Sequence, residues 1–105
     1  MKMKTSELSG AALDRAVLKA LNDPVQELIW ATRRHISYSS DWSFGGPIIE
    51  REGIGLNYYP DSGLWHAGTC EGTVWGMDRT PLIAAMRCYV ISRLGDVVEI
   101  PEEVK

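Results

Sequence analysis

The chain has 105 residues, a hydrophobic fraction of 45% and a formal net charge of −3. These values indicate one folded domain over residues 1–105 and argue against extended disorder. No apolar run approaches the roughly 18 residues of a membrane span, and the opening MKMKTSELSG lacks the apolar core of a secretory signal. We therefore expect a cytoplasmic protein without membrane contact.

The first helix is predicted over about residues 9–22. Ser9 is its expected N-cap, and apolar residues recur at helical spacing from Leu13 to Leu21.

Asp23 and Pro24 start a second helix that ends near His35, because Asp is a good N-cap and Pro suits the first helical position. One side of this helix carries Val25, Leu28, Ile29 and Thr32. Residues 36–47 are rich in turn-forming residues and predict irregular structure, followed by a helical turn at 47–52 that Gly53 closes.

A β-hairpin is predicted next. Residues 54–59 and 64–70 alternate in polarity, and the turn sequence PDSG separates them. Val74 and Trp75 add a short third strand.

The clearest helix covers residues 81–94. Thr80 caps it, Pro81 takes its first position and Gly95 ends it. The sequence DVVEIP then predicts a short strand. The fold class is therefore α+β: a small domain with N-terminal helices, a central β-hairpin or three-stranded antiparallel sheet, and a C-terminal helix followed by a short strand.

Charge is unevenly distributed. Residues 1–37 carry six Lys and Arg against four acidic side chains, whereas residues 38–105 carry five against ten. An acidic body argues against nucleic acid as a partner, because phosphate neutralisation needs a clustered basic face. The alternative is a basic patch of Lys19, Arg33 and Arg34 on the N-terminal helices.

Catalytic and metal-binding motifs are absent from the sequence. His66 and Cys70 lie four apart on a predicted strand, about 13 Å from each other, too far to share a zinc ion. No nucleophile elbow or phosphate loop is present, and Cys70 and Cys88 are expected to be reduced, partly buried thiols. We predict no catalytic residue, metal or cofactor. The alternative is an enzyme or small-ligand site near Asp41, His66 and Arg87.

Arg87 stands at the border of the apolar stripe of the last helix. Such an arginine either reaches solvent or is held by a carboxylate. We expect a structural ion pair, with Asp41 as the candidate partner and Glu50 or Glu52 as alternatives.

Four aromatic residues have weak claims to the core, namely Trp30, Trp42, Phe44 and Tyr59. Large rings exposed together mark a contact surface, so these four are the candidate partner-binding residues. Trp42 and Phe44 belong to residues 40–52, SDWSFGGPIIERE, which form either a binding surface or a structural corner.

Several stretches resemble the NinX-like family of small phage and prophage proteins. They are TSELSGAALDRAV (5–17), SDWSFGGPIIEREGI (40–54), LWHA (64–67) and TPLIAAMRCYVISRLGDVVEIP (80–101). The resemblance implies a phage or prophage accessory protein in a bacterial cytoplasm and brings no catalytic residues. We expect a non-catalytic module that binds a host or phage protein, or a second copy of itself.

Overall fold

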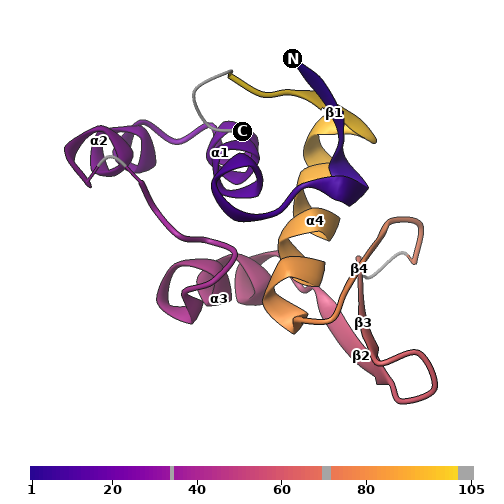
Figure 1. Ribbon diagram of the computed structural model, residues 1–105. Coiled ribbons are helices and arrows are strands. Elements are labelled where there is room, and N and C mark those ends of the chain that lie inside the picture. Colours follow the sequence, from indigo (N-terminus) through magenta and orange to yellow (C-terminus); the bar gives the residue numbers. More distant parts are fainter. Residues whose placement is uncertain (34, 70–71, 102–105) are drawn as a thin grey trace.

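The computed structural model describes residues 1–33, 35–69 and 72–101. Cys70, Glu71 and Arg34 lie outside the described residues. Figure 1 shows the arrangement of the elements. In chain order they are β1 (Lys2–Lys4), the 3₁₀ helix η1 (Thr5–Glu7), α1 (Gly10–Leu21), α2 (Pro24–Arg33), α3 (Trp42–Glu52), β2 (Gly55–Tyr59), β3 (Leu64–Gly68), β4 (Trp75–Asp78), α4 (Pro81–Leu94) and β5 (Val97–Glu99).

Helix α4 is the centre of the fold. It packs against β3 and β4 on one side and against α1 and α3 elsewhere (Figure 1). Residues on several sides of this helix are fully buried, including Ala84, Met86, Cys88 and Val90. A helix covered from more than one direction is apolar around most of its circumference. The predicted bounds are confirmed, because the Thr80 hydroxyl accepts from the amide of Ile83 and Gly95 ends the helix.

The central sheet is antiparallel with the order β2–β3–β4. Ala67 of β3 pairs with Leu56 of β2 and with Gly76 of β4, and Ala67 is fully buried. Successive residues of a strand face opposite sides of the sheet, whereas directly paired residues face the same side. Leu56, Ala67 and Gly76 therefore lie together on the side that α4 covers. The prediction of a hairpin with a short third strand is confirmed.

A second, two-stranded sheet joins β1 to β5, with Met3 opposite Val98. Val98 and Ile100 are buried, which explains the apolar residues of the predicted final strand. The sequence analysis did not predict β1, since its partner lies more than 90 residues away in the chain.

Helix α3 corrects the expectation of irregular structure for residues 42–47, whereas residues 36–41 lie outside any helix or strand, as predicted. The helix begins at Trp42, because the Asp41 carboxylate accepts from the Ser43 amide at 2.9 Å and caps the first turn. Gly45 then lies directly on the Tyr38 carbonyl and the Leu82 side chain, where a Cβ atom would overlap both. Gly45 therefore serves close packing here, and Pro47 lies inside the helix without ending it.

The thiol of Cys88 is expected to be unreactive in the folded protein. Cys88 is fully buried, and burial raises the pKa of its thiol to about 11. Because the thiolate is the nucleophile, a rise of about two units from the ordinary value slows reaction with a disulfide reagent at pH 8 about 100-fold. A Cys70→Ser variant leaves this single thiol for a kinetic assay. Rapid reaction without denaturant would contradict the burial.

Candidate functional site

The central sheet has one side that no described helix covers. The uncovered side carries the residues of β2, β3 and β4 that alternate with Leu56, Ala67 and Gly76, respectively. Among them, Tyr59, Trp75 and Met77 are large and about half exposed, and His66 is partly exposed. Figure 1 shows α4 along the other side. We call Tyr59, His66, Trp75 and Met77 the sheet surface.

The indole ring of Trp75 lies on the backbone of Gly68, its cross-strand neighbour. A Cβ atom at Gly68 would lie 2.8 Å from Cζ3 and 3.0 Å from Cε3 of that ring. Trp75 is nevertheless 49% exposed. One part of the ring thus packs on Gly68 while much of the remainder is accessible to solvent.

Tyr59 and His66 form the other half of the sheet surface. Their ring centroids lie 4.2 Å apart with the planes tilted by 48°. His66 of β3 pairs with Met77 of β4. This row connects Tyr59 of β2 to β4, the strand that carries Trp75 on the same side of the sheet. Neighbouring side chains on one sheet side support each other's orientation. The result is a continuous apolar and aromatic surface.

The segment 40–52 forms α3 with its capping residue and is anchored in the core at two positions. Gly45 and Ile48 are buried, and the Ser43 hydroxyl donates to Asp41 at 2.6 Å. Hydrogen bonds from the Ser43 hydroxyl and amide lower the pKa of the Asp41 carboxyl below its usual value. The large hydrophobic residue that this segment exposes is Trp42, with 51% of its surface accessible to solvent.

The four predicted partner-binding aromatics do not form one cluster. Phe44 contacts the Tyr38 ring edge-on at 6.3 Å, and Trp30 stacks on His35 at 5.1 Å, so both rings have partners within the protein. Trp42 begins α3, whereas Tyr59 ends β2. Tyr59 belongs to the sheet surface, together with Trp75 and Met77, which were not predicted as binding residues.

Arg87 pairs with Asp78 and not with Asp41, which corrects the expected partner. Its Nη1 lies 3.0 Å from Asp78 Oδ1. Nη1 also donates to the Met77 carbonyl at 2.7 Å, and Nε donates to the Leu8 carbonyl at 2.8 Å. The cause is the packing of β4 along α4, which brings Asp78 to the arginine while Asp41 caps α3.

The alternative site of Asp41, His66 and Arg87 is not assembled. Arg87 lies on α4, on the covered side of the sheet, whereas His66 faces the opposite side. Asp41 caps a different helix. Among the described residues, no group of three or more His, Cys, Asp or Glu side chains is placed to hold a metal ion.

Sequence reasoning missed the buried carboxylate of Asp14. It is 2% exposed, and it accepts from His35 Nε2 at 2.6 Å and from the Ser39 amide at 2.8 Å. These bonds fix the segment between α2 and α3 to α1. The available signal was the position of Asp14 within the apolar stripe of α1, next to Leu13 and three residues before Val17.

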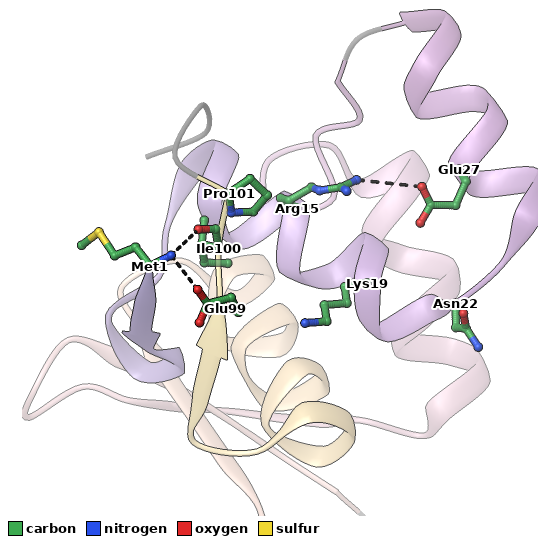
Figure 2. A pocket seen from close by; sticks show the side chains of 8 residues that line it. All are labelled: Met1, Arg15, Lys19, Asn22, Glu27, Glu99, Ile100 and Pro101. Carbon is green, nitrogen blue, oxygen red and sulfur yellow. Dashed lines mark hydrogen bonds and ion pairs between the residues drawn. The ribbon is translucent and has the colours of Figure 1, made fainter.

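A cavity of about 610 Å³ lies beside α1 (Figure 2). Cations and carboxylates alternate around it: Arg15 lies 3.9 Å from Glu27, and Lys19 shares the cavity with Glu99. Its lining residues are Met1, Arg15, Lys19, Asn22, Glu27, Glu99, Ile100 and Pro101. Lys19 and Arg15 therefore do not form the uniformly basic face that nucleic-acid binding needs.

No helix within the described ranges has the length and apolar character needed to cross a membrane.

Two comparisons with known proteins bear on the family of the chain. No curated protein matches the sequence. Residues 4–93 match the sequence model of the family described as Bacteriophage P22, NinX. Because this match takes in most of the chain, the protein belongs to the NinX family of bacteriophage proteins.

Proposed function

We propose that this phage accessory protein is a non-catalytic interaction module whose sheet surface binds a protein partner in the cytoplasm of the host bacterium. The observation that carries the proposal is the exposed Trp75 ring, supported by Gly68 and continuous with Met77, His66 and Tyr59. Trp and Tyr, with Arg, are enriched among the residues that dominate binding energy at protein interfaces. Exposed apolar patches of this kind mark interaction sites.

Charge favours a protein over a nucleic acid as the partner. Strands β2, β3 and β4 contain no Lys or Arg. The one acidic residue in these strands, Asp78, is already paired with Arg87. A surface without cations has nothing to neutralise a phosphate backbone, whereas an apolar patch suits the apolar side chains of a protein.

The test is affinity capture from phage-infected cells, with wild type compared to Trp75→Ala and Trp42→Ala. The two tryptophans are matched in exposure, at 49% and 51%, so each variant removes a similar exposed area. We expect Trp75→Ala to lose a specifically retained protein at least about tenfold, because interface tryptophans are typical hot spots. Trp42→Ala is expected to retain it.

Photocross-linking locates the contact. A photoreactive residue at Asn57, which pairs with His66 in the centre of the sheet surface, is expected to capture the same protein. Placed at Glu50 on α3, it is expected to capture none. Loss of the partner in Trp42→Ala with retention in Trp75→Ala would assign binding to α3 and overturn the proposal, as would the absence of any partner. Circular dichroism of each variant controls for unfolding.

A further inference from the structure

Strand β2 has an open edge. In the sheet order β2–β3–β4 it is an outer strand, so within the described residues no strand pairs along its second edge. Four of its five residues are exposed, and Leu56 is partly buried. The edge of an outer strand presents backbone N–H and C=O groups without partners. The chemical group that satisfies such a row is the backbone of an extended polypeptide.

One hydrogen bond at the end of β3 fixes the orientation of its backbone. The Thr69 amide donates to the Val74 carbonyl at 3.3 Å, on the β4 side of the strand. Backbone groups of successive residues alternate between the two edges of an antiparallel strand, so those of His66, three residues earlier, point to β2. The Met77 carbonyl, opposite His66, accordingly faces away from β3 and accepts from Arg87 at 2.7 Å.

The same alternation assigns the free backbone groups of β2. Asn57 pairs with His66, so the N–H and C=O groups of Asn57 point to β3. Those of its neighbours Leu56 and Tyr58 therefore point to the open edge. Each of these two residues offers one donor and one acceptor to an added strand.

The edge of β2 lacks the usual protection. Natural sheets shield an open edge with charged side chains, proline or bulges. Among the other outer strands that the structure describes, β1 has two lysines, β5 has Glu99 and β4 has Asp78. Strand β2 contains neither charge nor proline, and it pairs with β3 residue for residue, without a bulge. This edge is thus available for strand addition.

We propose that the partner of the sheet surface contributes an extended segment that pairs with β2 as a fourth strand of the central sheet. The inference rests on the proposed function, because it states how that same partner is bound. On one side of the sheet the added strand lies beside Tyr59, whose ring contacts His66. On the other side it lies beside Tyr58, which is half exposed and contacts Trp65 at 5.2 Å. Residues on both sides of the segment meet an aromatic ring, which favours β-branched and aromatic side chains.

A second copy of β2 fits this edge less well than a foreign segment. The antiparallel register that uses the outward groups of both Leu56 and Tyr58 places Asn57 on a two-fold axis. Gly55 of one copy then lies opposite Tyr59 of the other. Gly55 has no side chain to pack on the tyrosine ring, and the two Asn57 side chains add no apolar contact. A foreign segment can place an apolar side chain at both positions.

Linear peptides of about 10 residues, selected on the wild type from a random library, are the probe, because this length spans a strand. Tyr58→Pro and Tyr58→Ala form the matched pair of variants. Both lose the ring, but proline also removes the outward N–H and is tolerated on an outer strand. We expect Tyr58→Pro to bind the selected peptides at least about tenfold more weakly than Tyr58→Ala. Equal binding by the two variants, or a library without enriched peptides, overturns the proposal.

Amide hydrogen exchange of the wild type detects the added strand without any variant. In the free protein the Leu56 and Tyr58 amides are expected to exchange rapidly, whereas the Asn57 amide, which bonds to β3, is protected. A bound peptide is expected to slow exchange at Leu56 and Tyr58 at least about tenfold. Unchanged exchange at these two amides overturns the proposal. Protection that rises with protein concentration in the absence of peptide would assign the edge to a second copy and overturn it as well.

Affinity capture of the partner separates the edge from the sheet surface. Loss of the partner in Trp75→Ala with equal retention in Tyr58→Pro and Tyr58→Ala would reject strand addition and keep the sheet surface. Loss in Tyr58→Pro alone would reject the sheet surface and keep strand addition. We expect Trp75→Ala and Tyr58→Pro each to lose the partner, and Tyr58→Ala to retain more of it than Tyr58→Pro.

Discussion

Replacing Gly76 by alanine is expected to lower the free energy of unfolding by about 3 kcal/mol or more, among the larger effects for one added methyl group. Gly76 lies in β4 where the strand meets α4. A Cβ atom there would overlap the Ala84 carbonyl oxygen and lie 2.6 Å from the Cys88 amide nitrogen. Both atoms belong to the helix backbone, so no side-chain rotation relieves the overlap and β4 must move away from α4.

Gly55→Ala is the matched control for this substitution. Gly55 is also a strand glycine, but it lies on the uncovered side of the sheet, and the nearest atom to its Cβ position is the Gly68 carbonyl oxygen at 3.9 Å. We expect the unfolding free energy of Gly55→Ala to differ from that of the wild type by less than about 1 kcal/mol. Denaturant titration followed by circular dichroism measures both variants. Equal midpoints for the two would show that β4 and α4 are less closely packed than described.

The elements that sequence predicted well are those whose signals are local. Thr80, Pro81 and Gly95 mark both ends of α4 within a few residues, and the turn PDSG separates two alternating strands. Each of these signals acts through backbone geometry at its own position. No contact with a distant residue is needed to interpret them.

The errors arose where a distant contact decides the structure. Gly45 and Pro47 suggested a turn, yet Gly45 is required because α3 packs on the Tyr38 carbonyl and on Leu82 of α4. Strand β1 exists because β5 pairs with it, and three residues have no detectable strand signal of their own. Tertiary packing overrides local preference in both cases.

The candidate site was predicted in part. Tyr59 was named, but Trp75 and Met77 were not, although their alternation with Gly76 places them on one side of β4. Recognising that this side adjoins Tyr59 and His66 requires the register of three strands and the position of α4. Sequence periodicity gives the two sides of each strand, but not which side a helix covers.

Arg87→Met is expected to destabilise the protein by about 3 kcal/mol, although methionine preserves much of the side-chain volume. The Arg87 side chain is 13% exposed. It bonds the Leu8 carbonyl before α1 and the Met77 carbonyl and Asp78 carboxylate of β4. Its loss leaves three acceptors without this donor and disconnects the N-terminal segment from β4.

Arg93→Met is the control on the same helix, because Arg93 is 49% exposed and lies 3.4 Å from Glu52. Exposed ion pairs contribute little, so we expect a loss below about 1 kcal/mol. Asp78→Asn removes the ion pair but keeps the hydrogen bonds from Arg87 to the two carbonyls. We expect this variant to lose less unfolding free energy than Arg87→Met. Thermal unfolding of the three variants ranks them by stability.

Because Arg87 fixes the backbone of Met77, Arg87→Met is also expected to weaken partner capture by the sheet surface, whereas Arg93→Met is not. Equal stability of the two arginine variants would remove Arg87 from its structural role.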